Sequence, residues 1–493
     1  MPPETAVPTP SLSSSPLSAR ERSAIRMIPF IVGCALFMQM LDSTVVATAL
    51  PAMAVSLGSS VVGMNVAITS YLLAVAVFVP ISGWAADRFG AKRVFIAAIL
   101  LFTLSSVACA ASQSLAQLVA ARIVQGLAGA MMVPVGRIIL LRKIPKTELL
   151  KAMAFLSLPA LLGPVIGPPL GGFLVTYASW HWIFLINIPV GVLGIGLVMY
   201  YIREDYPVTA PRLDWIGFIL SAVSLATLVS GFEAMGHQSM PLAQLLIMVG
   251  VGLACGLLYV WHARRSEHPI IDLSLLRVPT FAIATLGGNL CRFAVGASPF
   301  LLAILLQVGF GLSPFSAGMI TFTSAVGAMI MKFVATPIIQ RFGFKRVLTV
   351  NALLTAVFIA LCGLFRADTP IWIMAAILVI GGFFRSLQFT AVNTLTYADL
   401  GTADMSRASS FAAMAQQLGI SLGVACAAVT LNLSMNWRGG TELALVDIIW
   451  GFVAIGLITA ASAISFSRLP TGAGDNLHQN KVKKHAKAPE RRM

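Results

Sequence analysis

Long apolar runs alternate with short polar segments along almost the whole chain. Fourteen of these runs, each of roughly twenty residues, are long enough to cross a bilayer as helices. The predicted spans lie near 27–50, 66–86, 94–111, 117–139, 152–175, 183–202, 215–234, 242–261, 280–306, 316–339, 347–365, 371–396, 408–432 and 445–467. The pattern therefore predicts an all-α polytopic membrane protein with fourteen transmembrane helices.

The positive charges predict how these spans are oriented. With both ends placed in the cytoplasm, 27 of the 33 Lys and Arg residues fall in inward segments and only two, Arg366 and Arg438, fall outside. The remaining four lie within the predicted helices: Arg122, Arg292, Lys332 and Arg385. Cytoplasmic loops of membrane proteins carry such an excess of basic residues. We therefore expect a bacterial inner-membrane protein with both termini in the cytoplasm.

Composition excludes several other classes. Hydrophobic residues make up 58% of the 493 residues, charged residues 10%, and the mean hydropathy is +0.89. A soluble protein of this size needs far more charge on its surface. The net charge of +15 is spread over short loops, which favours contact with anionic lipids over nucleic-acid binding. The six cysteines lie in apolar runs without a C-x-x-C pair, so neither disulfides nor a metal site is expected, and no cofactor is predicted.

An internal repeat predicts how the spans are grouped. Residues 87–94 read DRFGAKRV after the second span, and residues 340–347 read QRFGFKRV after the tenth. This offset requires two six-helix halves with a central pair inserted between them, a plan in which the substrate site lies between the halves. The predicted parts are a disordered cytoplasmic N-terminus 1–26, an N-terminal bundle 27–202, a central pair with cytoplasmic linkers 203–279, a C-terminal bundle 280–467 and a basic cytoplasmic tail 468–493.

Four motifs in order give the chain a family resemblance. Residues 83–93, GWAADRFGAKR, look like the loop signature of the major facilitator superfamily, and residues 122–126, RIVQG, match its fourth-helix motif. Residues 41–51, LDSTVVATALP, are similar to the first-helix motif of its fourteen-helix drug:proton antiporter branch. The glycines and prolines of 163–172 match the fifth-helix antiporter motif, and 180–189 also fits, with His181 where many members carry Arg. The resemblance covers about 27–467 and implies the major facilitator fold.

The resemblance assigns a conformational latch to the first loop signature. Its residues are Gly83, Asp87, Arg88, Gly90, Lys92 and Arg93. Asp87 is expected near a helix N-terminus of the other half, where the helix dipole favours an anion. Gln340 takes this position in the second copy, so only the first half would keep an acidic latch. A merely solvated charged loop is the alternative.

The fifth span carries small residues at regular spacing. The motif residues are Gly163, Pro164, Gly167, Pro168, Gly171 and Gly172. Glycines at i, i+4 and i+8 make one smooth helix face, and prolines add bends. The resemblance implies a conformational hinge, whereas close helix packing alone explains the glycines almost as well.

Charges within the spans are the sharpest chemical signal, because ionisable groups inside a membrane usually mark a pathway or a proton relay. In the family the first, fourth, ninth and twelfth spans line the cavity, and here these carry Asp42, Arg122, Arg292 and Arg385. Asp42 is the acidic residue that lies well inside a span, at a depth similar to that of Arg122. We expect the two to pair and to couple protons to transport, and a purely structural ion pair is the alternative.

Arg292 and Arg385 have no acidic partner visible in the sequence. With Asp42 charged, the cavity lining would be net positive, which favours an anionic or zwitterionic substrate unless backbone carbonyls satisfy these arginines. The candidate cavity residues are Gln39, Thr44, Gln125, Arg292, Arg385 and Gln388.

These observations predict a secondary transporter that exports small molecules by proton antiport, as in multidrug efflux. Alternatives are proton-driven efflux of an organic acid or a metal chelate, and a non-transporting sensor on the same fold. Nothing resembles G-x-S-x-G, H-E-x-x-H or a Walker A loop, so enzyme activity is not expected. The predicted partners are the small-molecule substrate, protons and the lipid bilayer, with no nucleic acid, and the chain is expected to function as a monomer.

Overall fold

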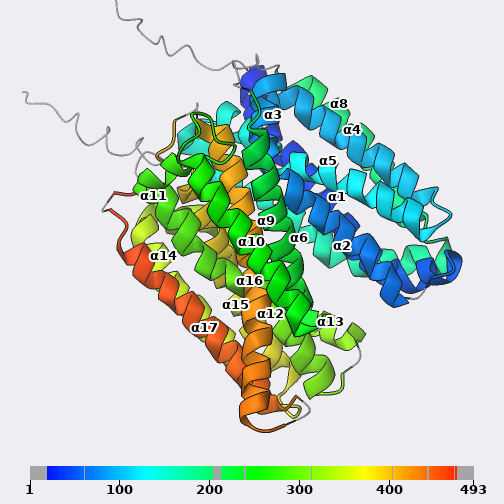
Figure 1. Cartoon of the computed structure of the whole chain (residues 1–493). Helices are drawn as coiled ribbons and strands as arrows, with labels where there is room; N and C mark the ends of the chain where they lie inside the picture. Colours follow the sequence, from blue (N-terminus) through cyan, green and yellow to red (C-terminus); the bar gives the residue numbers. More distant parts are fainter. Residues whose placement is uncertain are drawn as a thin grey trace, which may run out of the picture.

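The computed structural model shows two helical bundles side by side, with a further helix pair packed against them (Figure 1). It describes residues 19–59, 61–203, 212–237, 240–312, 314–401, 404–440, 443–470 and 472–474. Within these ranges the regular structure is entirely helical. Residues 1–18 and most of the basic tail 468–493 lie outside the described residues, and residues 19–26, which we expected to be disordered, form the start of helix α1.

The N-terminal bundle is formed by the first eight helices. They are α1 (Ala19–Ser56), α2 (Val61–Phe78), α3 (Ile81–Phe89), α4 (Ala91–Ala110), α5 (Leu115–Lys143), α6 (Lys146–Tyr177), α7 (Trp182–Leu185) and α8 (Asn187–Tyr201). The second span is a pair, α2 and α3, bent by 61°. Pro80 lies at this bend, where its missing N–H interrupts the helical hydrogen bonds.

The central pair and the C-terminal bundle follow. The pair is α9 (Trp215–His237) and α10 (Leu242–Ala263). A short 3-10 helix, η1 (Leu273–Arg277), leads to a composite span made of α11 (Pro279–Ala282), η2 (Ile283–Gly287), α12 (Gly288–Ala303) and η3 (Ile304–Gly309), in which η2 and η3 are π-helical. The bundle is completed by α13 (Pro314–Phe342), α14 (Phe344–Cys362), α15 (Ile371–Leu395), α16 (Met405–Trp437) and α17 (Leu445–Ser467).

The fourteen expected spans are present. Twelve helices in the described residues are long and apolar enough to cross a membrane, and the bent pair adds one more. Helix α6, with 32 residues, supplies the fifth span. Several helices exceed the predicted bounds: α1 continues to Ser56 rather than ending near residue 50, α2 begins at Val61 rather than near 66, and α6 begins at Lys146 rather than near 152. The added start of α6, KTELLK, is polar, whereas the added end of α1, PAMAVS, and the added start of α2, VVGMN, are largely apolar.

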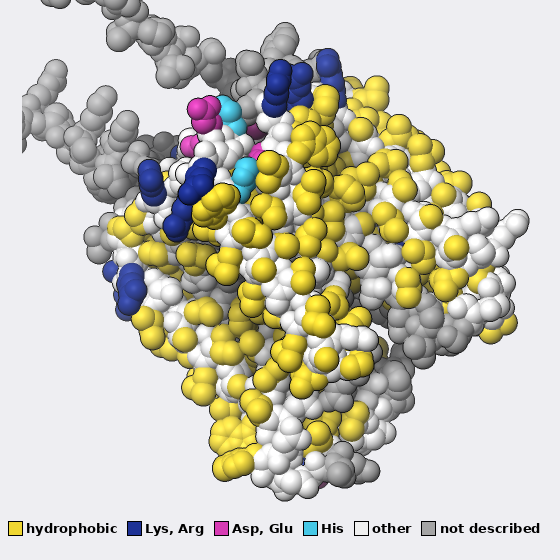
Figure 2. All heavy atoms as spheres, in the orientation of Figure 1, with side chains coloured by type: hydrophobic (Ala, Val, Ile, Leu, Met, Phe, Trp, Pro, Cys, Tyr) yellow, Lys and Arg dark blue, Asp and Glu magenta, His cyan; other side chains and the backbone are white. Residues whose placement is uncertain are grey.

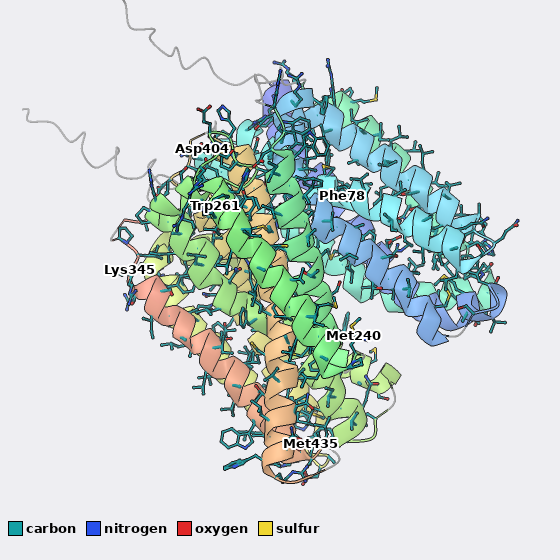
Figure 3. All side chains as sticks on the ribbon, viewed as in Figure 1. Phe78, Met240, Trp261, Lys345, Asp404 and Met435 are labelled. Atoms are coloured by element: carbon teal, nitrogen blue, oxygen red, sulfur yellow. The ribbon has the colours of Figure 1, made fainter. Side chains whose placement is uncertain are left out.

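One end of the molecule carries the basic side chains. On the face in Figure 2, Lys and Arg gather at the upper end, whereas the flanks below are covered mainly by hydrophobic side chains. Figure 3 locates Trp261 and Asp404 at this basic end and Met240 and Met435 toward the opposite end. On α10, Leu257 is 73% exposed. Apolar side chains exposed on helices of this length face lipid, so the protein is a multi-pass membrane protein.

The two halves lie close together at the basic end and diverge toward the opposite end (Figure 1). Helix α16 packs on α3 and α5 of the N-terminal bundle, and α6 packs on α13 and α15. The inserted helix α9 packs on both α2 and α16, with the rings of Phe78 and Phe218 6.1 Å apart. The central pair is therefore in contact with both halves.

The two copies of the loop repeat have the same backbone shape. Gly90 separates α3 from α4 with φ = 90°, and Gly343 separates α13 from α14 with φ = 74°. Both values lie where glycine carries no steric penalty. The structure thus reproduces the internal repeat that the sequence predicts.

Candidate functional site

A buried ion pair joins α1 and α5 inside the N-terminal bundle. Arg122 donates from Nη1 to Oδ2 of Asp42 at 2.5 Å, and both side chains have no exposed surface. Arg122 also donates from Nε to the backbone oxygen of Ala67 at 3.1 Å. The expected pairing of the two charges is present.

Neutral polar groups complete the coordination of the Asp42 carboxylate. Gln125 donates from Nε2 to Oδ1 of Asp42 at 2.9 Å, and Asn187 donates from Nδ2 to the same oxygen at 3.3 Å. Both amides also donate to Oγ of Ser106, at 2.8 and 3.1 Å. Five residues from α1, α4, α5 and α8, which we call the Asp42 cluster (Asp42, Ser106, Arg122, Gln125, Asn187), form one connected network. Donors directed at a carboxylate stabilise its charged form.

Three unpaired polar atoms adjoin this cluster. Oε1 of Gln39, the hydroxyl of Tyr71 and Nη2 of Arg122 are buried without a hydrogen-bond partner among the described residues. The Arg122 guanidinium lies over the ring of Tyr71, 4.4 Å from its centroid. Unpaired buried donors and acceptors are costly, so these atoms are candidates for contact with a proton donor or a cargo. Gln39 was among the predicted cavity residues, whereas Tyr71 was not assigned a role.

Asp42 and Arg122 lie at the same depth, as expected, because their side chains are hydrogen-bonded. The helix ends from which that depth was inferred are different. In the structure Asp42 lies 14 residues before the end of α1 at Ser56, and Arg122 lies 7 residues after the start of α5 at Leu115. Helix α1 simply continues past Pro51 and extends beyond α5, because a helical proline is tolerated when its neighbours satisfy the freed backbone.

The loop signature contacts the other half at the basic end. Oδ1 of Asp87 accepts hydrogen bonds from Nη2 of Arg142 and from Oγ of Ser406, both at 2.6 Å. Ser406 is in the first turn of α16, as expected for an anion placed at a helix N-terminus of the second half. Gly90 forms the turn with its positive φ, while Arg88 and Arg93 are exposed and Lys92 donates to the backbone oxygen of Met199.

Further contacts hold the halves together at this end. Gly83 donates its N–H to Oγ of Ser410 at 2.8 Å, and a Cβ on Gly83 would lie 2.6 Å from the Ser406 backbone oxygen. Lys146, at the start of α6, donates from Nζ to the backbone oxygens of Ala398 and Leu400. We call these contacts, together with those of Asp87, the basic-end gate. In the part of the chain that the structure describes, the hydrogen bonds between the halves gather here.

The glycines of α6 pack against α1 within the same half. A Cβ on Gly163 would lie 2.7 Å from Cβ of Met40, and one on Gly167 would overlap the Thr44 side chain. Thr44 donates to the backbone oxygen of Gly163 at 3.4 Å, so this predicted cavity residue lies in the seam between α1 and α6. Gly171 is buried and Gly172 is exposed, and the side chains of Pro164 and Pro168 lie outside the described residues.

The predicted cationic residues of the C-terminal bundle are held by neutral groups. Arg292 donates to Oδ1 of Asn289 at 2.9 Å and to Oδ1 of Asn393 at 3.2 Å. Arg385 donates from Nη2 to Oγ of Ser324 at 2.6 Å. Among the described residues no carboxylate lies within ion-pair distance of either. Backbone carbonyls, the alternative partners that the sequence analysis considered, do not accept from them there.

Gln388 belongs to the same bundle. Its Oε1 accepts from Asn351 at 2.8 Å, and its Nε2 lies 3.4 Å from Sγ of Cys291. Arg292, Arg385 and Gln388 line one small pocket between α12, α14 and α15. Gln125, by contrast, belongs to the Asp42 cluster, so the predicted cavity residues fall into two separate groups.

Sequence reasoning missed a buried charge and two cluster members. Arg137, counted with the inward segments, lies inside α5 and is 8% exposed. Asn187 and Ser106 also escaped notice, although an asparagine inside the apolar run 180–201 was a usable signal.

The fold and these motifs define a transporter family. The sequence model of the Major Facilitator Superfamily matches residues 32–297 and 284–490. The chain belongs to the major facilitator superfamily.

Two individual relatives align with this chain over most of its length. The chain is 41% identical over 450 residues to MdtD of Pectobacterium carotovorum subsp. carotovorum, covering 91% of this chain and 96% of that protein. That relative is named as a proposed multidrug resistance protein. MdtD of Serratia proteamaculans is 41% identical over 453 residues, covering 91% of this chain and 94% of the relative.

Solved structures show the same fold at low identity. The human organic anion transporter MFSD10 has a TM-score of 0.64 at 16% identity, with 90% of this chain and 99% of that chain covered. The proton:xylose symporter XylE has a TM-score of 0.63 at 14% identity, covering 92% of this chain and 98% of that chain.

Proposed function

We propose that this protein is a proton-coupled exporter of small molecules, a multidrug efflux transporter of the bacterial inner membrane that works as a monomer with both termini in the cytoplasm. The observation that carries the proposal is the Asp42–Arg122 pair, because a fully buried carboxylate in a membrane helix bundle is costly and is the group best suited to carry a proton. The names of the MdtD relatives support multidrug substrates.

Asp42 is the proposed proton carrier and Arg122 its counter-ion. When Asp42 is charged, Arg122 and two amides stabilise it. A proton on Asp42 removes the negative charge and leaves the Arg122 cation without its ionic partner. Protonation of Asp42 therefore changes the free-energy difference between the two conformations of the transport cycle. Proton coupling requires this dependence of the conformational equilibrium on protonation.

The basic-end gate is the proposed conformational latch. With the basic end in the cytoplasm, the structure corresponds to a transporter closed toward the cytoplasm, with Asp87 joined to Ser406 across the halves. Opening inward requires loss of these contacts, and alternating access follows from movement of one half against the other.

The direct test is pH-gradient-driven transport in inside-out vesicles, comparing wild type with Asp42→Asn at matched expression. The variant keeps the size and most hydrogen bonds of the side chain but cannot exchange a proton. We expect loss of gradient-driven export with normal insertion. Undiminished transport by Asp42→Asn would refute the assignment of Asp42 as the coupling residue.

An anionic cargo, such as an organic acid or a metal chelate, is the second candidate. One observation favours it: Arg137 of α5 and Arg292 of α12 are buried basic residues on opposite halves. A carboxylate that enters between the halves would supply negative charge to them. The same vesicle assay, run with a cationic dye, an organic acid and a metal citrate, separates the two candidates by which compound moves.

A further inference from the structure

Two small pockets adjoin one another inside the C-terminal bundle. One is lined by residues of α12, α13, α14, α15 and α17, and the second by residues of α12, α14 and α15. Both are lined by Thr355 and Arg385, so the two pockets are neighbours, and we call them together the α14 pocket. Arg292 lines its second part.

Positive charge at the α14 pocket is not balanced within the described residues. Arg385 and Arg292 bond only to neutral oxygens. Lys332 of α13, which is 6% exposed, donates to Oγ1 of Thr390 at 2.7 Å. Arg292 and Lys332 are buried, Arg385 is half-buried, and Lys332 lies outside the pocket lining. Cations without counter-ions are unfavourable in a low-dielectric interior.

The acidic group on the packed helices does not supply the missing charge. Asp447 of α17 is buried, but its Oδ1 accepts from Ser434 and its Oδ2 from Arg438 and the N–H of Ala444. In the described residues, helix α14 contributes only Lys345 and Arg346 as charged side chains, at its basic end. The N-terminal bundle, in contrast, pairs its buried Arg122 with Asp42.

Unpaired hydroxyl groups line the same pocket. Oγ1 of Thr355 and Oγ of Ser298 are buried without a hydrogen-bond partner among the described residues, and both side chains line the pocket. Thr355 is 3% exposed and Ser298 is 4% exposed. Hydroxyl donors beside guanidinium donors are the combination that binds an anion.

We propose that the α14 pocket binds a small inorganic anion of chloride size, with Arg385 and Arg292 supplying charge and Thr355 and Ser298 donating hydroxyl hydrogen bonds. Each part of the pocket has room for about one water-sized guest. A drug-sized cargo does not fit this space, so the anion is a resident of the bundle. This site is independent of the proposed proton coupling at Asp42.

The test is thermal unfolding of the purified protein in detergent at constant sodium concentration and ionic strength, with gluconate replaced stepwise by chloride. Gluconate is too large for the pocket. We expect a saturable rise in melting temperature of about 2–5 °C in chloride. Arg385→Gln should abolish the rise, while Arg346→Gln, which removes an exposed charge on α14, should keep it.

Thr355→Val provides a sharper signature because it does not remove charge. Replacing an unpaired buried hydroxyl with an apolar group of the same shape is neutral or stabilising. The variant should therefore melt at or above the wild-type temperature in gluconate and show a weaker response to chloride. This variant also keeps the test valid if Arg385→Gln does not fold.

Three results would overturn the proposal. Equal melting temperatures in chloride and gluconate for the wild type would mean that water alone occupies the pocket. A chloride response of equal size in wild type, Thr355→Val and Arg385→Gln would mean a general salt effect. A rise with acetate but none with chloride would assign the pocket to a carboxylate and reject the halide. None of these outcomes depends on transport activity, so they leave the role of Asp42 untouched.

Discussion

At the scale of single residues, the Asp42 cluster contains one carboxylate, one guanidinium and three neutral groups. Its net charge changes only when a proton arrives or leaves. Ser106 does not touch Asp42, yet its Oγ accepts from both amides that do. We therefore regard Ser106 as a positioning residue that fixes the amide orientation.

Ser106→Ala should lower the rate of proton-driven export severalfold. Without the Ser106 oxygen, Gln125 and Asn187 are held less firmly against the Asp42 carboxylate. The measurement is the initial rate of export at a fixed pH gradient. Ser105→Ala is the matched control, because Ser105 bonds only to backbone oxygens of its own helix. Equal export rates for the two variants would exclude a positioning role for Ser106.

The charged members of the cluster and Gln125 were predictable, whereas Ser106 and Asn187 were not. A carboxylate within an apolar span is rare and expensive, so Asp42 and Arg122 are conspicuous in the sequence alone. Serine and asparagine cost far less in a membrane helix and are common there. Whether Ser106 and Asn187 point inward depends on how α4 and α8 rotate when packed, which a single helix pattern does not determine.

At the scale of elements, α6 owes its close packing on α1 to its glycines. The contacts of Gly163 and Gly167 with Met40 and Thr44 leave no space for side chains. These two positions hold α1, and with it Asp42, at a fixed distance from α6.

Gly167→Ala should destabilise the protein by about 1–3 kcal/mol, because the added methyl group would overlap Thr44 and force α1 away from α6. Gly172→Ala, on the same helix but with nothing within 4 Å of the added atom, should leave stability unchanged. Melting temperatures of both variants in one detergent check this difference. Equal stability would show that the seam adjusts freely, which favours the hinge interpretation of α6 over rigid packing.

Element lengths were only partly predictable, because apolar runs mark the part of a helix that faces lipid or core. Helix α6 begins with the polar segment KTELLK, which hydropathy does not detect, and α1 continues past Pro51, where the sequence pattern predicts an end. Similarly, the 61° bend between α2 and α3 at Pro80 is invisible to a hydropathy window that reads 66–86 as one span.

At the scale of the whole molecule, the basic-end gate decides which conformation is stable. Its contacts are polar and partly exposed: Asp87 keeps 20% of its side-chain surface accessible. Such contacts contribute modestly to stability, which suits a connection that opens in every transport cycle.

Asp87→Asn should shift the population toward the conformation that is open at the basic end, because the neutral amide binds Arg142 and Ser406 less strongly. Spin labels at the exposed positions Glu148 and Arg346, one in each half, should report longer distances. Asp404→Asn is the control, since Asp404 pairs with Arg407 of its own half. Unchanged distances together with normal transport would reduce Asp87 to an ordinary surface charge.

The architecture of two bundles and an insertion followed from the offset between the two copies of the loop repeat, and the family comparison confirms the fold. The conformational state did not follow. Closure at the basic end arises from contacts such as Lys146 with Ala398 and Gly83 with Ser410, which join distant segments. These contacts form only at one relative orientation of the two bundles. The free-energy difference between orientations is small, so the sequence does not indicate which one the protein adopts.

The position of α9 has a mechanical consequence. Two similar bundles facing each other have a pseudo-twofold relation, and their two lateral seams would then be equivalent. Here α9 occupies only the seam between α2 and α16, while α6 meets α13 directly on the other. The inserted helix therefore breaks the symmetry. When the two bundles rotate relative to each other, they slide against α9 on one side only. We therefore expect the pivot to lie nearer to α9 and the larger displacements to occur along α6 and α13.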